Sequence, residues 1–149
     1  PLALSNKTMA SNFSMTSTEL GGAMSTFNEK YGHDGNKILS IFSYNTLGIT
    51  INDCIDYFNL KQPDYVKIDV DGIEHLILEG AGDYLKNRKI KSISVEINEN
   101  FKLQYSNVLK IMKKYNFFLR HKKNNIGSFA GANQKFFRTF NYVFDKKNI

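Results

Sequence analysis

The sequence contains a single cysteine, Cys54, among its 149 residues, so it has no internal disulfide framework. A reducing compartment is the default for such a chain, and we expect a cytoplasmic protein. No run approaches the ~20 apolar residues of a membrane-spanning helix, which predicts no membrane span. The start of the chain lacks the basic-then-apolar order of a secretory signal peptide. With 42% hydrophobic and 13% aromatic residues, the chain has enough apolar material for a core, which predicts one domain over residues 1–149.

Basic residues outnumber acidic ones, and they are unevenly distributed. The first 60 residues carry three basic and five acidic side chains, whereas residues 61–149 carry 17 and nine. A basic half can attract nucleic acid, anionic lipid or an anionic substrate. Aromatic and lysine residues interleave between residues 101 and 118, but their helical and strand spacing assigns most of them to the core. We therefore predict a solvated basic surface and no nucleic-acid partner.

Hydrophobic spacing predicts strands alternating with helices. Residues 1–47 read as largely irregular, with a strand at 2–4, another at 38–44 and a short strand that ends at Ile49. Thr50 is the expected N-cap of a helix, with Asp53 supplying a carboxylate in the first turn. Further strands are predicted at residues 65–70, 90–97, 117–121 and 142–144, with helices after residue 71, at 81–86 and at 103–115, and with a Gly- and Asn-rich turn region before residue 142. This order predicts an α/β fold built on a parallel sheet.

Charged residues stand at the ends of two predicted strands, where open parallel sheets place their ligands. Lys67 and Asp69 alternate along the first strand and share one side of it, and Glu96 ends the second. Charged side chains in an apolar strand are costly unless they are paired or used. If the strands are neighbours, Asp69 and Glu96 face one cleft, where they can act as a base, bind a divalent cation or orient a hydroxyl.

Structural roles for the same residues stay open. Lys67 can form an ion pair with Asp69 or Glu96, while Asp71 and Glu74 have the spacing of a helix cap and its capping box. No His or Cys spacing of a zinc site is present, and no complete ligand set is evident, so we assign no metal ligands. The sequence also has no G-x-S-x-G, Walker or G-x-G-x-x-G segment.

Residues 63–74, Pro-Asp-Tyr-Val-Lys-Ile-Asp-Val-Asp-Gly-Ile-Glu, resemble the central motif of the FkbM-type methyltransferases. In that family Glu and Ala are usual at the positions of Asp71 and Ile73. Weaker matches occur along the chain in the order that the family shows. They are Ala-Leu-Ser at 3–5, Thr-Ile-Asn-Asp at 50–53, Leu-Glu-Gly-Ala at 78–81, Val-Glu-Ile at 95–97 and Asn-Tyr-Val-Phe at 141–144.

The resemblance implies a Rossmann-like class I fold with a mostly parallel sheet, and S-adenosylmethionine as the cofactor. It also implies O-methylation of a hydroxyl on a sugar, glycan or related metabolite. Ala3, Leu4 and Ser5 would lie near the adenine, Asp69 near the transferred methyl group, and Glu96 beside it. The loop over residues 11–35 would be a mobile acceptor loop.

The first two strands of that fold, which carry the Gly-rich loop and the ribose-binding acid, have no counterpart in this chain, so the resemblance implies a partial domain. A noncatalytic remnant that binds a partner or glycan is the alternative function. The absent first strand would lie between the third and fourth strands of the sheet. Its absence exposes a parallel edge, through which we expect copies of the chain to associate.

Overall fold

The computed structural model describes residues 2–124 and 138–147. Along the chain the elements are β1 (Leu2–Leu4), β2 (Met9–Met15), β3 (Thr26–Phe27), β4 (Phe42–Ile49), α1 (Ile51–Tyr57), β5 (Tyr65–Ile68), α2 (Glu74–Gly80), α3 (Gly82–Lys86), β6 (Ser92–Asn98), α4 (Lys102–Lys114), β7 (Phe117–Asn124) and β8 (Thr139–Lys146). The predicted Gly- and Asn-rich turn region falls largely on residues 125–137, outside the described residues. None of the described helices is long and apolar enough to cross a membrane.

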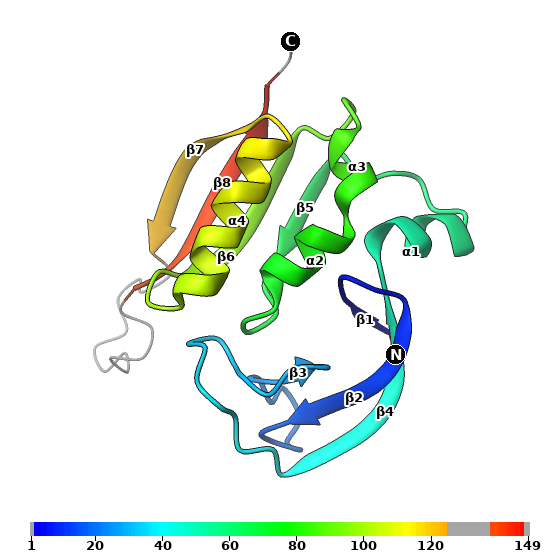
Figure 1. Cartoon of the computed structure of the whole chain (residues 1–149), viewed down its shortest axis with the longest axis vertical. Helices are drawn as coiled ribbons and strands as arrows, with labels where there is room; N and C mark the ends of the chain where they lie inside the picture. Colours follow the sequence, from blue (N-terminus) through cyan, green and yellow to red (C-terminus); the bar gives the residue numbers. More distant parts are fainter. Residues whose placement is uncertain (1, 125–137, 148–149) are drawn as a thin grey trace.

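The strands form two four-stranded sheets rather than one (Figure 1). The first has the order β1-β4-β2-β3 and the second the order β5-β6-β8-β7. Only the pairs β1/β4 and β5/β6 are parallel. The mixed α/β class is confirmed, but the mostly parallel sheet is not. The last strand, β8, lies between β6 and β7 and runs antiparallel to both of them.

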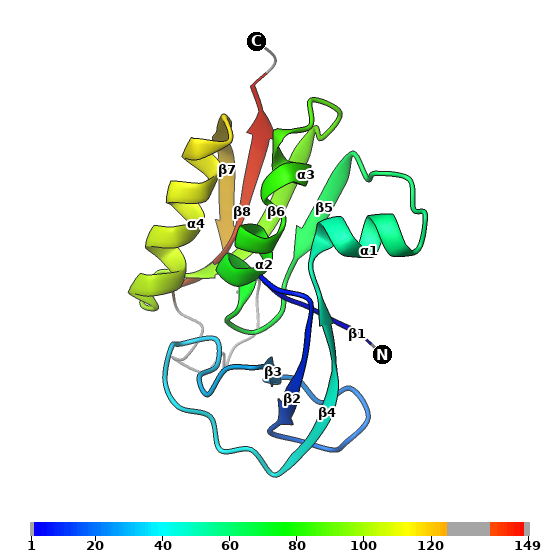
Figure 2. The ribbon, with the colours of Figure 1, turned by 45° about the vertical axis from the view of Figure 1, so that its right-hand side comes forward.

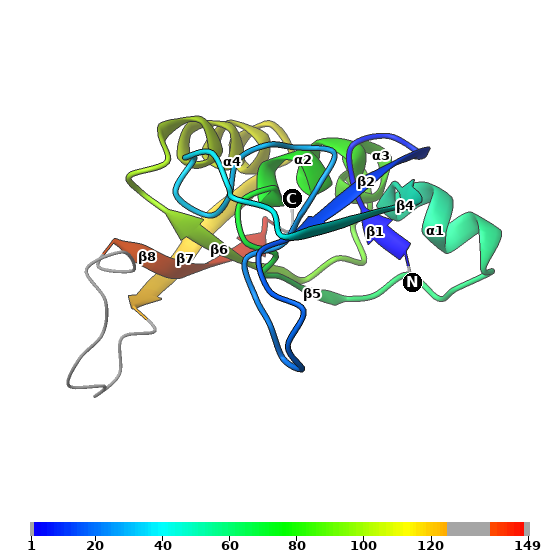
Figure 3. The ribbon, with the colours of Figure 1, turned by 90° about the horizontal axis from the view of Figure 1, so that it is seen from below.

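The main core lies between the second sheet and the helices α2, α3 and α4, which all cover the same face of that sheet (Figures 1 and 3). In β6, Ile93, Val95 and Ile97 are at most 1% exposed. Their partners include Ile77 and Leu78 of α2 and Val108 and Met112 of α4. The intervening side chains of β6 are half-buried and point to the opposite face, because strand side chains alternate. The predicted alternation in this strand is confirmed.

The region before residue 50 has more strand than the sequence predicts. Residues 9–15 form β2, which pairs with β4 along its whole length, and β4 is one continuous strand from Phe42 to Ile49. The antiparallel pairings of β2 with β3 and with β4 thus replace part of the irregular loop expected at residues 11–35. Figure 2 shows β2 and β4 side by side below the second sheet. The Thr50 cap is confirmed, since its hydroxyl accepts the Asp53 N–H at 3.0 Å.

Among the described residues, β5 pairs with β6 alone and leaves its other edge free. An unpaired strand edge presents backbone donors and acceptors to any neighbouring strand, and Tyr65 on this strand is 67% exposed. We expect residues 1–149 to self-associate through β5, with a concentration-dependent mass in sedimentation velocity. Tyr65→Lys adds charge at the edge and should weaken the association. A monomer with one sharp thermal transition at every concentration would contradict this expectation.

Candidate active site at the strand ends

The carboxyl ends of β5 and β6 bring two predicted site residues together. The strands are parallel neighbours, with Lys67 opposite Ser94 and Ile68 opposite Val95. Asp69 comes directly after β5, and Glu96 lies at the corresponding level of β6. The two side chains are hydrogen-bonded to each other. The predicted juxtaposition of Asp69 and Glu96 is therefore present in the fold, although their roles stay predictions.

Burial and neighbouring negative charge make Glu96 a weak acid. Burial is the largest cause, followed by the charges of Asp69 and Glu74, and together they raise the pKa of Glu96 to about 7. A carboxyl with that pKa is half-protonated near neutral pH, and its protonated form can donate a hydrogen bond to Asp69. A group with this pKa can accept or return a proton at physiological pH.

Lys67 lies beside the pair and contacts its more exposed member. Its Nζ is 2.7 Å from Asp69 Oδ2, and the hydrogen bond with Asp69 raises the pKa of Lys67. Of the two partners that the sequence allowed, Asp69 is the one in contact. Because the Lys67 side chain is 62% exposed, the ion pair adds little to stability. Its effect is to hold the Asp69 side chain in position.

Glu74 organises the turn that follows β5. It is 1% exposed and accepts the backbone N–H of Val70 at 3.0 Å and of Gly72 at 3.1 Å. The Gln104 side-chain amide donates a further hydrogen bond to the same carboxylate. Burial raises the pKa of Glu74. Glu74 does reach back to the preceding backbone, as in a capping box, but the N–H groups that it binds belong to the turn.

The predicted capping role of Asp71 is wrong. The helix α2 begins at Glu74, and its N-cap is Ile73, which makes no side-chain cap hydrogen bond. Asp71 instead accepts the backbone N–H of Met24 at 2.8 Å, which joins the turn to the segment before β3. Gly72 beside it has φ +127°, and a Cβ there would lie 2.5 Å from the Gly32 carbonyl oxygen. The turn is thus packed against backbone on both sides.

Two of the three predicted adenine-contacting residues line a pocket next to this turn. Ala3 and Leu4 contribute to a cavity of about 340 Å³ that Val70 and Asp71 also line. Ser5 does not line this pocket; it is 2% exposed and donates its backbone N–H to Ile49. Asp69, the fourth predicted cofactor residue, also lies outside the pocket lining.

The family model of the methyltransferase FkbM domain matches residues 14–119. The chain belongs to this family. The family assignment made from the central motif is therefore confirmed. No curated protein and no solved structure matches the chain. The matched part of the FkbM domain contains Lys67, Asp69 and Glu96, whereas residues 3–5 and 141–144 lie outside it.

Glu99 of the FkbM domain, a second carboxylate near the end of β6, is held in ion pairs. Lys122 Nζ and Arg138 Nη2 are each 2.7 Å from its carboxylate oxygens, and the Tyr142 hydroxyl donates to it at 2.6 Å. These hydrogen bonds lower the pKa of Glu99 to about 2. Nothing in the sequence around Glu99 indicates these partners, which come from distant segments.

Glu99→Gln should lower the free energy of unfolding by about 2 kcal/mol, because it leaves Lys122 and Arg138 without their partner and those cations are partly exposed. The pKa of Glu99 is lowered on folding, so its contribution to stability is present above the usual carboxyl pKa. That contribution is lost as pH falls from about 4.5 toward 2. Urea denaturation at pH 7 and pH 3 measures both effects. A wild-type stability equal to that of Glu99→Gln at pH 7 would contradict this role.

The described parts of the FkbM domain contain no group of three or more His, Cys, Asp or Glu side chains arranged to hold a metal ion. His33 lies in the loop before β4, His75 in α2 and His121 in β7. The strand-end site therefore consists of the Lys67 cation and the carboxyl groups of Asp69 and Glu96, next to a turn held by the buried Glu74.

Proposed function

We propose that this FkbM domain acts in the transfer of a methyl group from S-adenosylmethionine to a hydroxyl of a sugar, glycan or related metabolite. The observation that carries the proposal is the hydrogen-bonded pair Asp69 and Glu96 at the ends of two parallel strands. Such strand ends are the usual ligand sites of open α/β sheets. The pair lies within the region that matches the methyltransferase family. The Rossmann-like class I fold is part of the same proposal.

The pocket beside β1 fits one part of that cofactor. Its walls are mainly apolar, and Thr26, which lines it, has a buried hydroxyl oxygen without a hydrogen-bond partner. Apolar walls with an unpartnered hydroxyl suit a purine ring, for which Ala3 and Leu4 would form one side. When bound, the cofactor supplies an electrophilic methyl group. The chain has no G-x-G-x-x-G loop, and the pocket lining offers no cation for the carboxylate of the methionine end.

The chain's own residues would position the acceptor and move its proton. A hydroxyl at the strand ends would donate a hydrogen bond to the carboxylate pair, which accepts the proton as the oxygen becomes bonded to carbon. Lys67 holds the Asp69 side chain through their ion pair, so that the carboxyl pair is positioned for the hydroxyl. Holding the two reactants in line supplies much of the rate of such a reaction.

A noncatalytic binding role is the second candidate, and it is favoured by the lack of a glycine-rich loop in this chain. Calorimetric titration of residues 1–149 with S-adenosylmethionine is expected to show weak binding or none, because the described pocket suits only the purine end. Micromolar affinity would contradict this expectation, and would mean that the described residues form a complete cofactor site.

The proposed activity is tested on the longest natural polypeptide that contains these residues. S-adenosylmethionine with an isotopically labelled methyl group is incubated with a panel of neutral and acidic sugars, glycans and other hydroxylated metabolites. Label transferred to an acceptor hydroxyl is the expected result. Cofactor binding without transfer to any acceptor, together with capture of a glycan, would favour the noncatalytic role.

A further inference from the structure

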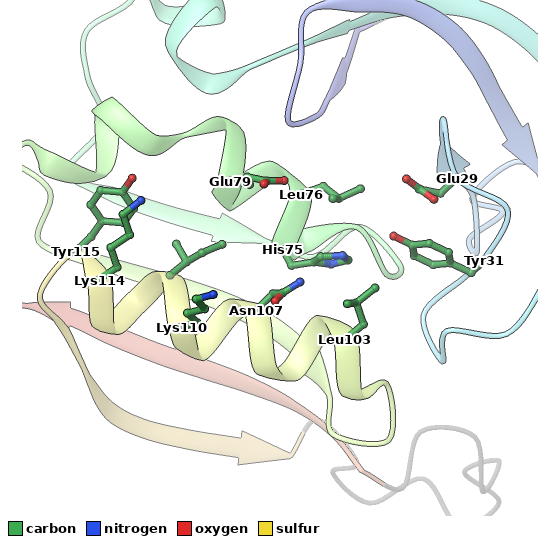
Figure 4. A pocket seen from close by; sticks show the side chains of 11 residues that line it. Glu29, Tyr31, His75, Leu76, Glu79, Leu103, Asn107, Lys110, Lys114 and Tyr115 are labelled. Carbon is green, nitrogen blue, oxygen red and sulfur yellow. The ribbon is translucent and has the colours of Figure 1, made fainter.

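A groove between α2 and α4 lies on the helix side of the second sheet, opposite the face that carries Asp69 and Glu96. Its volume is about 490 Å³, within the range of small-ligand sites. Figure 4 shows side chains from three segments converging on it: the loop after β3, the helix α2 and the helix α4. Its polar and charged lining includes Glu29, Tyr31, His75, Asn107, Lys110 and Lys114.

His75 lines the groove and has a buried ring nitrogen without a hydrogen-bond partner among the described residues. The residue is 3% exposed, and its Nδ1 makes no hydrogen bond with any described residue. Its ring is stacked with Tyr31, with 6.4 Å between ring centroids, and meets Phe101 edge-on at 5.9 Å. Since buried polar atoms in native proteins almost always have a partner, a ligand atom in the groove would fill this position.

The two ends of the groove carry opposite charges. At one end Glu29 lies close to Tyr31 (Figure 4), and partial burial raises the pKa of Glu29. At the other end Lys110 and Lys114 project from successive turns of α4 (Figure 4). Within the described part of the chain, none of these three side chains takes part in an ion pair. Glu79, between the ends, accepts a hydrogen bond from Asn6 at 3.1 Å.

The spacing of the charges sets the length of a matching ligand. Figure 4 shows Glu29 at the same end of the groove as Leu103, which lies in the first turn of α4. A rise of about 1.5 Å per residue places Lys110 and Lys114 roughly 10 Å and 16 Å from Leu103 along the helix axis. An extended peptide of three to four residues spans about 10–14 Å. The apolar side chains of Leu76, Leu103 and Ile111 also line the groove and suit an apolar spacer.

We propose that this groove binds a linear zwitterion, such as a short peptide with free termini. Its ammonium group lies at Glu29 and its carboxylate at Lys110 and Lys114. The Asn107 amide and the His75 Nδ1 contact the polar atoms between the two ends. Tyr31 stays a neutral donor in this site, since burial and the charge of Glu29 raise its pKa to about 12. The proposal does not depend on methyl transfer, and its test uses no cofactor.

The probe is 8-aminooctanoate, whose two charges are separated by about the required span. Octanoate carries only the anion, octylamine only the cation, and 4-aminobutanoate both charges at too short a distance. Binding to residues 1–149 is followed by NMR, through the shifts of the His75 ring and the α4 amides. We expect 8-aminooctanoate to bind at least about tenfold more tightly than each of the other three, with the His75 ring among the shifted signals.

Variants at the two ends assign the orientation. Glu29→Gln should weaken 8-aminooctanoate about tenfold and leave octanoate unchanged, whereas Lys110→Ala should weaken both and leave octylamine unchanged. The matched controls are Glu19→Gln and Lys113→Ala, which remove like charges outside the groove; circular dichroism checks that each variant is folded. Octanoate binding as tightly as 8-aminooctanoate, equal losses in the control variants, or no shift at His75 would each overturn the proposal.

Discussion

Asp69→Asn in the longest natural polypeptide that contains these residues should lower the rate of methyl transfer by about 10²–10⁴-fold, the usual scale of a lost general base. The fold and cofactor affinity should stay unchanged. The carboxylate is partly exposed and its ion pair with Lys67 adds little to stability, so a large effect on turnover would come from the chemistry. Steady-state kinetics with thermal denaturation of the same samples measures both quantities.

Glu96→Gln is the matched variant, because the two carboxylates are hydrogen-bonded to each other. Residues that handle one proton act as a unit, so the double variant should lose about as much activity as the more damaged single variant. Near-normal turnover in folded Asp69→Asn protein would contradict the proposed role and leave Asp69 as the ion-pair partner of Lys67.

Glu74→Ala should cost about 3–5 kcal/mol of unfolding free energy, a large share of the 5–15 kcal/mol that a domain usually has. The substitution removes a buried acceptor of three hydrogen bonds and leaves the N–H groups of Val70 and Gly72 and the Gln104 amide unpartnered. Urea denaturation followed by circular dichroism measures the change.

Glu74→Gln is the control, because it preserves shape and one carbonyl acceptor and should lose about half as much. Glu79→Ala on the same helix tests the generality of the effect: Glu79 is exposed, so its removal should cost less than about 1 kcal/mol. A Glu74→Ala variant as stable as Glu79→Ala would show that the turn after β5 does not depend on this carboxylate.

The second sheet was the more predictable half of the fold. Ile93, Val95 and Ile97 alternate with more polar residues because one face of the strand is buried. A periodic pattern of this kind can be recognised from neighbouring residues alone. The adjacency of Asp69 and Glu96 followed from a single correct premise, that two consecutive strands of an α/β pattern are parallel neighbours. The insertion of β8 between β6 and β7 depends on pairing across distant segments, which composition does not encode.

The failures share one physical origin. The strand β2, of sequence Met-Ala-Ser-Asn-Phe-Ser-Met, has weak strand character and forms by pairing with β4. Asp71 has the sequence context of a helix cap. In the structure, however, its carboxylate accepts a hydrogen bond from the backbone N–H of Met24, 47 residues away. Glu99 likewise finds partners in β7 and β8. In each instance a long-range contact outweighs the local preference.

The central claim is that the Glu96 carboxyl, next to Asp69, exchanges a proton near neutral pH. Titration of residues 1–149 with ¹³C-labelled carboxyl groups, followed by NMR, measures it without any cofactor or acceptor. The predicted result is a Glu96 carboxyl that titrates near pH 7 and at lower pH in Asp69→Asn, since the negative charge of Asp69 contributes to the shift. A Glu96 carboxyl that titrates at its ordinary value of 4.5 in both proteins would contradict the claim.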